Sequence, residues 1–125
     1  MIYIEPYMKA VLAVLPDFSW NKVKRIHNLQ IAYQTENRWD SNTLLSIQFL
    51  YENGNDKYDL LFYFHHPRSF SFETSGEHHQ ISLVINDMKE RGWEGISYEV
   101  EDYEEQSLHF FCSKIEFIHA EKLNM

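Results

Sequence analysis

The sequence predicts a mainly β (α+β) protein, in which one N-terminal helix precedes about seven or eight largely antiparallel strands that form a curled sheet or sandwich. Three observations predict this fold. Aromatic residues make up 16% of the chain, and flat rings pack well on pleated sheets. Apolar residues follow a clear helical spacing near the N-terminus, and from residue 23 the prevailing pattern is alternation of apolar and polar residues. Turn-forming residues interrupt that alternation at short intervals, which is typical of antiparallel sheets.

The chain of 125 residues is predicted to be a single domain (residues 1–125), because this length supports one hydrophobic core. The N-terminus does not resemble a signal peptide, and no segment approaches the roughly 20 apolar residues of a membrane span. The single cysteine, Cys112, lies in the apolar run LHFFC, which indicates a small buried side chain in a reducing compartment. We therefore expect a cytoplasmic protein.

The first element is a short helix from Glu5 to Leu15. Its apolar residues fall on one helical face because their spacing is i, i+3, i+4 and i+7: Met8, Val11, Leu12 and Leu15. Pro6 suits the first turn of a helix, and Pro16 ends the helix by excluding Leu15 from the α region.

A long hairpin system follows. A strand beginning at Val23 alternates as far as Ile31, with a bulge expected near Asn28, and the polar stretch 34–42 is interpreted as a connection. The next strand, 43–52, is joined through Asn53-Gly54-Asn55-Asp56 to a returning strand, 57–66. Asn-Gly between two apolar runs is a strong hairpin signal, and the returning strand is apolar on both faces. It is therefore predicted to lie inside a sheet.

Shorter elements make up the second half. Pro67 ends the preceding strand, 69–74 alternates as a strand, and 75–77 forms a turn. Residues 80–91 fit either a helix ending at Gly92 or a strand, and we favour the strand because of the β-branched pair Val84-Ile85.

Three strands are expected in the tail. Residues 96–101 alternate, 102–106 form a turn, 108–112 alternate again, and the last strand is predicted over 115–119.

The charge is unevenly distributed. The net charge is −8, yet residues 1–69 hold seven acids and seven bases, whereas residues 70–125 hold twelve acids and four bases. The densest acidic stretch, GWEGISYEVEDYEEQS, contains no base. Such a field repels nucleic acid and anionic membranes and attracts basic partners, so neither nucleic acid nor membrane is expected as a partner. The alternative is that these acids only maintain solubility and protect strand edges.

Four of the seven histidines occur in HHPRSFSFETSGEHH, residues 65–79. Strand alternation sends His65 and His66 to opposite faces, so at most one of them can join a given metal site. A conceivable cluster would combine one histidine of each pair with His109 or His119 and with Glu77. No HExxH, paired CxxC or HxH spacing supports it, so no metal site and no cofactor is predicted.

No catalytic constellation is predicted either. The lone cysteine lies in a strand pattern and not at a helix start, and no GxSxG, phosphate loop or GxGxxG occurs. The carboxylates at 99 and 101 alternate with apolar residues, as on a solvated strand face. The sequence therefore favours a protein that is not an enzyme.

The segment from Leu83 to Phe117 resembles the tail of immunity-protein family 50 of polymorphic toxin systems, and of related proteins from Firmicutes. The matching elements, about a third of the chain, are Asp87, Gly92-Trp93, Tyr98-Glu99-Val100, Asp102 with Glu104 and Glu105, Phe110-Phe111-Cys112, and 115–118. The resemblance implies a non-enzymatic antitoxin that blocks a basic toxin, such as a nuclease, by presenting a negative surface.

On that interpretation the binding residues are aromatic anchors surrounded by acids. They are Trp93, Glu94, Tyr98, Glu99, Glu101, Asp102, Tyr103, Glu104 and Glu105. Trp93 has an alternative role as a core residue beside the Gly92 turn. Two other functions stay open: a structural or assembly module that forms a homodimer through an exposed strand edge, and a histidine-dependent metalloprotein.

Overall fold

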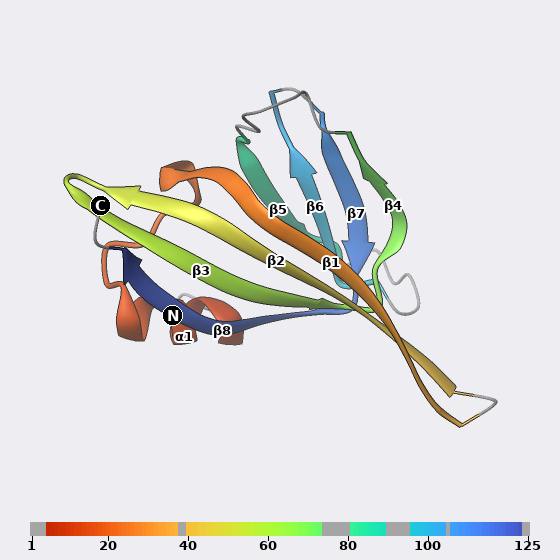
Figure 1. Ribbon diagram of the computed structural model, residues 1–125. Coiled ribbons are helices and arrows are strands. Elements are labelled where there is room, and N and C mark those ends of the chain that lie inside the picture. Colours follow the sequence, from red (N-terminus) through yellow and green to blue (C-terminus); the bar gives the residue numbers. More distant parts are fainter. Residues whose placement is uncertain (1–4, 38–39, 74–80, 90–95, 105, 124–125) are drawn as a thin grey trace.

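The computed structural model describes residues 5–37, 40–73, 81–89, 96–104 and 106–123. Within these residues the chain forms one α-helix, a 3₁₀ turn and eight strands in two antiparallel four-stranded sheets (Figure 1). The mainly β prediction with an N-terminal helix is confirmed. No helix among the described residues is long and apolar enough to cross a membrane.

Sheet A has the strand order β1-β2-β3-β8, and sheet B has the order β4-β7-β6-β5. The strands of sheet A are long: β1 (Val23–Asn37), β2 (Asp40–Asn53), β3 (Asp56–His65) and β8 (Lys114–Leu123). Those of sheet B have five residues each: β4 (Arg68–Phe72), β5 (Leu83–Asp87), β6 (Tyr98–Asp102) and β7 (Leu108–Cys112). Strand β3 lies between β2 and β8, so its predicted position inside a sheet is confirmed.

The chain passes from one sheet to the other at two adjacent corners. Strand β3 leads to β4 through His66 and Pro67, and β7 leads to β8 through Ser113. The corners are tied together, because Ser113 N donates to His65 O at 2.9 Å and the His66 ring nitrogen Nδ1 lies 2.8 Å from Ser113 Oγ. His66 has a φ of 55°, a left-handed conformation that turns the chain sharply. The first histidine pair is therefore part of the sheet-switching corner.

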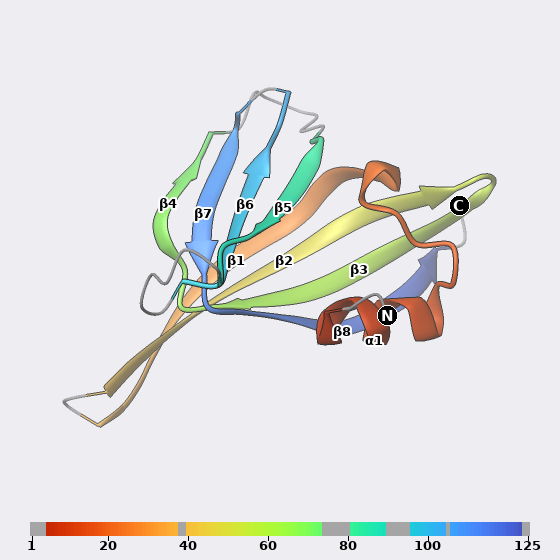
Figure 2. The ribbon, with the colours of Figure 1, turned by 180° about the vertical axis from the view of Figure 1, so that it is seen from behind.

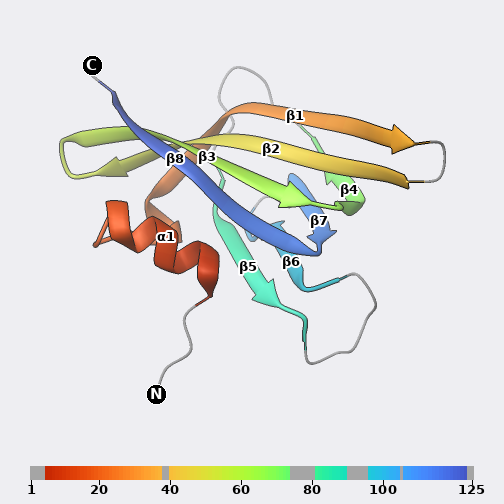
Figure 3. The ribbon, with the colours of Figure 1, turned by 90° about the horizontal axis from the view of Figure 1, so that it is seen from below.

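The core lies between the two sheets. The fully buried side chains of sheet A include Ile47, Phe49 and Phe62, and they belong to the same cluster as Val100 and Phe110 of sheet B. Sheet B covers one end of sheet A, while the helix α1 (Pro6–Val14) lies along the other end (Figures 2 and 3). The helix thus completes the cover of a long sheet that the short strands of sheet B leave partly open.

Helix α1 and the 3₁₀ turn η1 (Trp20–Lys22) fill this gap with aromatic packing. Trp20 has its ring centre 5.2 Å from that of Phe62, and Phe18 stacks on Tyr51 at 5.3 Å. The helix buries Tyr7 and Val11. Apolar area buried in this way stabilises a fold by about 25 cal/mol per Å².

Several predicted boundaries are confirmed. The register of β1 shifts between Ile26 and Asn28, where the bulge was expected, and Gly54 has the positive φ of 63° that the hairpin turn requires. The ambiguous segment 80–91 contains strand β5, which supports the strand alternative. The predicted turn at 75–77, with His78, His79 and Gly92, lies outside the described residues.

Two predictions were wrong. The polar stretch 34–42 is not a connection, because β1 and β2 continue as a ladder through Gln34↔Asn42 and Thr35↔Ser41. Backbone hydrogen bonds form such a ladder whatever the side chains are, so polarity did not mark its end. The last strand is longer than 115–119, because β8 pairs with β3 as far as Lys57↔Leu123.

Candidate functional site

The outer face of sheet B carries the acidic residues that the sequence singled out. Along β6, Tyr98, Val100 and Asp102 are buried, while Glu99 and Glu101 alternate with them and are half-buried on the opposite face. The register of β5, β6 and β7 places six side chains on that outer face: Val84, Asn86, Glu99, Glu101, His109 and Phe111. Arg68 and Ser71 of β4 lie opposite Phe111 and His109, so they border these six residues on the same side. We call these six residues the outer acidic face.

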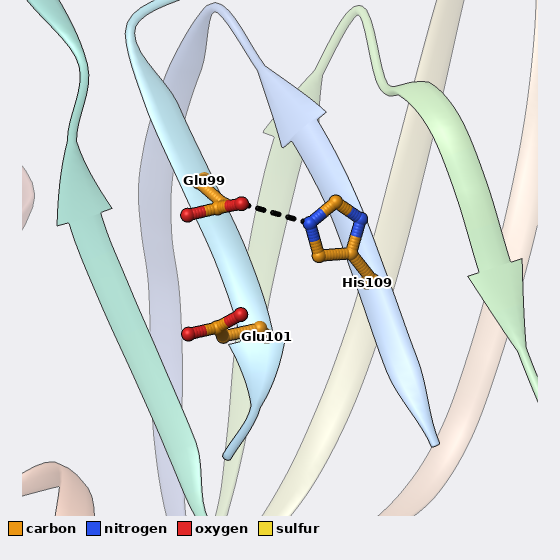
Figure 4. Close-up of side chains that lie close together, drawn as sticks. All are labelled: Glu99, Glu101 and His109. Atoms are coloured by element: carbon orange, nitrogen blue, oxygen red, sulfur yellow. Dashed lines mark hydrogen bonds and ion pairs between the residues drawn. The ribbon is translucent and has the colours of Figure 1, made fainter. Parts of the chain in front are cut away.

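Glu99 is held in place by its neighbours on both adjacent strands. Asn86 Nδ2 on β5 donates to Glu99 Oε1 at 3.0 Å, and His109 Nε2 on β7 lies 2.9 Å from Glu99 Oε2 (Figure 4). The His109 ring meets the Phe111 ring edge to face, with centres 5.1 Å apart. Glu99 is therefore a fixed carboxylate whose charge is partly offset by the imidazole when that ring is protonated.

Glu101 lies next to this pair and differs from it. It is directly opposite His109 in the strand register, and within the described part of the chain its carboxylate has no hydrogen bond or ion pair. A half-buried carboxylate without a partner among the described residues has acceptor capacity available for an outside group.

The three groups could also hold a cation. One ligand atom from each of Glu99, Glu101 and His109 can be chosen so that all three lie within 4.8 Å of one another. Carboxylate oxygens and an imidazole nitrogen suit divalent metals such as Zn²⁺ or Mn²⁺. A metal would first have to replace the existing Glu99–His109 hydrogen bond.

This trio is not the histidine cluster considered from the sequence. His65 pairs with Glu116 at 2.9 Å, and His66 bonds Ser113 at the corner. His78, His79 and Glu77 lie outside the described residues.

A turn beside the outer acidic face presents an aromatic ring. Residues 103 and 104 follow β6, and Gln106 N closes the turn on Asp102 O at 3.0 Å. Tyr103 is 69% exposed, and few other large hydrophobic side chains of the described residues are exposed. Glu104 beside it is exposed too. The turn thus presents an exposed ring beside an exposed carboxylate, a combination that suits a binding surface.

Asp102 does not lie on this surface. It is 0% exposed, and its oxygens accept hydrogen bonds from Ser82 N at 3.0 Å, Ser107 N at 3.3 Å and Ser107 Oγ at 2.6 Å. The side chain fixes the approach to β5 and the turn before β7. In the folded chain its side chain is therefore not exposed to a partner.

Tyr98 is also buried, with 6% of its surface exposed. Its hydroxyl donates to the Glu5 carboxylate, and Lys89 Nζ lies 4.8 Å from its ring centre. Burial, followed by the hydrogen bond to Glu5, raises the pKa of Tyr98 to about 12. This ring ties the helix to sheet B, so it does not serve as a surface anchor.

The remaining predicted residues are placed as follows. Trp93, Glu94 and Glu105 lie outside the described residues. Cys112 is fully buried, as its sequence context indicated, and burial raises the pKa of its thiol to about 12. The sequence interpretation missed Asn86 and His109 as partners of Glu99. Only the register of β5, β6 and β7 brings these residues together, and the sequence does not state that register.

Comparison of the chain with protein-family models, with curated proteins and with solved structures gave no match.

Proposed function

We propose that this chain is a non-enzymatic binding protein that holds a basic protein partner on the outer acidic face of sheet B. The observation that carries this proposal is Glu101, a carboxylate without a partner among the described residues, beside Glu99 on the same face. Lysine and arginine side chains of a partner would find two acceptors there. The resemblance to immunity proteins supports a narrower form of the proposal, in which the partner is a toxin that this cytoplasmic protein neutralises.

The charge around sheet B supports a basic partner. The described residues from 68 to 112 carry six acids and two bases, a net −4, and the bases are Arg68 and Lys89. Lys89 is already engaged, because its Nζ lies 2.8 Å from Glu5 Oε2 and 3.9 Å from Asp87 Oδ2. An excess of acids over bases speeds the encounter with a basic protein and disfavours acidic ones.

The apolar groups nearby suit the interior of a protein interface. Val84 and Phe111 share the face with the two glutamates, and Tyr103 projects from the adjoining turn. Interfaces are commonly held by a few aromatic anchors, with charged groups that set orientation and encounter rate. Tyr103 is the best candidate for such an anchor.

The experiment is rescue from a toxin encoded beside this chain's gene, followed by a binding measurement with the purified pair. Glu101→Lys combined with Glu104→Lys should abolish rescue and weaken binding at least about tenfold, since like charges then face the partner. The control is Glu121→Lys at an exposed position of β8 in sheet A, whose single charge reversal matches that of Glu101→Lys alone.

Loss of rescue and binding in the double variant, together with normal rescue and binding in Glu121→Lys, would support the outer acidic face as the site. No rescue by a well-expressed wild-type chain would refute the antitoxin function, and affinity that does not change with salt would refute electrostatic steering.

A further inference from the structure

The hairpin of β1 and β2 extends beyond the rest of the protein. Strand β3 pairs with β2 only as far as Leu44↔His65, whereas β1 and β2 stay paired to Asn37↔Asp40. We call the part beyond that pairing, residues 32–37 and 40–43, the arm; at its base Thr43 O still accepts a hydrogen bond from His66 N at 2.9 Å. Figures 1 and 3 both show it projecting away from the two sheets. A two-stranded ribbon alone in water is only marginally stable, so such an arm is expected to pack against or pair with another protein segment.

Strand β1 is also the edge of sheet A. The start of this edge is covered, because Ile81 N donates to Lys24 O at 3.1 Å. From Asn28 onwards, no residue of the described chain pairs with β1 on the side away from β2. Its outward backbone groups are thus available to a further strand.

This part of the edge lacks the usual protection. Edge strands of soluble proteins are commonly blunted by charges, proline or bulges. In β1 the register shifts lie before Asn28 and after Thr35, and the eight residues between them, NLQIAYQT, contain neither charge nor proline. In a chain of net charge −8, an uncharged segment is where a second copy can approach with least repulsion.

An apolar row also runs out along this edge. Leu29, Ile31 and Tyr33 pair with Ile47, Leu45 and Thr43 of β2, and directly paired residues point to the same face. Leu29 and Ile31 pack against the core, but Tyr33, at the start of the arm, is 77% exposed. The apolar row of the core thus continues on β1 into solvent, where a further strand could cover it.

We propose that the chain forms a two-fold homodimer in which residues 28–35 of β1 pair antiparallel with the same residues of a second copy. In an antiparallel pair, directly opposed residues point to the same face of the sheet, so the two-fold axis must pass through one residue and not between two. Ile31 and Ala32 are the two residues at the centre of segment 28–35, so the axis is expected at one of them. About Ile31, Leu29 would lie opposite Tyr33 of the second copy, and Gln30 opposite Ala32. The two sheets A become one eight-stranded sheet.

The geometry favours a second copy over a different protein. In an antiparallel pair each arm runs back along β1 of the other molecule, so one contact supports both arms. A basic partner would gain no electrostatic attraction at this edge, because residues 28–35 of β1 carry no charge. The dimer therefore uses a different surface from the outer acidic face and does not depend on the proposed function.

Sedimentation equilibrium of the chain alone tests the dimer. The wild type should show twice the mass of the 15.1 kDa chain. Ala32 is exposed, so Ala32→Lys and Ala32→Glu should fold normally, and each should raise the dimer dissociation constant about tenfold or more by placing like charges together. Mixing the two variants should restore the dimer.

The control is Ser71→Lys, an exposed position on β4, the edge strand of sheet B, where the same charge should leave the dimer intact. A monomeric wild type, an unaffected Ala32→Lys dimer, or equal dissociation by Ser71→Lys would each overturn the proposal. Amide exchange gives an independent measurement, because the outward N–H groups of residues 28–35 should be protected in the wild type and lose protection in Ala32→Lys.

Discussion

The Tyr98 hydroxyl of β6 donates a hydrogen bond to the carboxylate of Glu5, 93 residues earlier in the chain. Both oxygens of that carboxylate accept hydrogen bonds from Lys89 Nζ at 2.8 Å, and Lys89 Nζ lies over the Tyr98 ring. Tyr7 of the helix meets that ring edge to face, with centres 5.9 Å apart. This group of four side chains fastens the N-terminal helix to sheet B.

Tyr98→Phe should therefore destabilise the protein without disturbing its shape. The substitution removes one buried hydrogen bond to a charged group, which contributes about 1–3 kcal/mol to the free energy of unfolding. Urea denaturation measures the loss. The control Tyr103→Phe, at an exposed ring, should change stability by less than about 0.5 kcal/mol. Equal effects of the two substitutions would show that the tie to Glu5 contributes nothing.

Asp102 should behave as a structural residue and not as part of the binding surface. Asp102→Ala leaves the Ser82 and Ser107 amides without their acceptor, and each buried unsatisfied donor costs roughly 1–3 kcal/mol. We expect a loss of about 2–4 kcal/mol in the free energy of unfolding.

The neighbouring acid provides the comparison for that prediction. Glu104→Ala, at an exposed position, should change stability by no more than about 0.5 kcal/mol. If Asp102→Ala were as stable as Glu104→Ala, the buried carboxylate would have no role in holding the turn.

The strands could be predicted from the sequence because their two faces differ. Alternation in β6 and β7 arises from a buried face and a wet face, so Val100 and Phe110 were recognisable as inward residues. The arm could not be predicted, because beyond Ala32 β1 pairs with β2 alone in the described part of the chain, and hydrophobic alternation reflects a buried face and not backbone pairing. Backbone pairing alone continues there.

The site was only partly predictable for a related reason. Asp102 occurs in an acidic run, so its sequence context resembles a surface, but a donor 20 residues earlier, the Ser82 amide, accounts for its burial. The partners of Glu99 come from strands on either side, and their identity depends on the order β5-β6-β7. Sequence spacing contains periodicity but not the order of strands in space.

Stability should fall at alkaline pH. Burial raises the pKa values of Tyr7, Tyr98 and Cys112 to about 12, from ordinary values of 10.0 for tyrosine and 9.0 for cysteine. Burial lowers the pKa of Lys89, but hydrogen bonds to Glu5 and Tyr98 outweigh it and raise that pKa overall. In each case the folded chain holds the proton more tightly than the unfolded chain.

These contributions are fully present below pH 9, and they are lost as the pH rises from 9 towards 12, because the unfolded chain releases its protons first. The urea midpoint should fall across this range, and less steeply in Tyr98→Phe, which lacks one of the groups. A midpoint that stays constant from pH 9 upwards would contradict the assignment.

Two serines of β4 should respond in opposite directions to the same substitution. Ser69 has a φ of 52°, in the left-handed region that costs a residue with a side chain roughly 1–2 kcal/mol, whereas the φ of Ser71 is negative. Glycine removes that strain but makes the unfolded chain more flexible, at a cost of about 0.5–1 kcal/mol. Ser69→Gly should therefore raise the free energy of unfolding by up to about 1 kcal/mol, and Ser71→Gly should lower it by about 0.5–1 kcal/mol. Both positions are exposed, so neither change removes core packing. Urea denaturation of the two variants decides the matter: if both lost stability equally, the left-handed turn after Pro67 would not be strained.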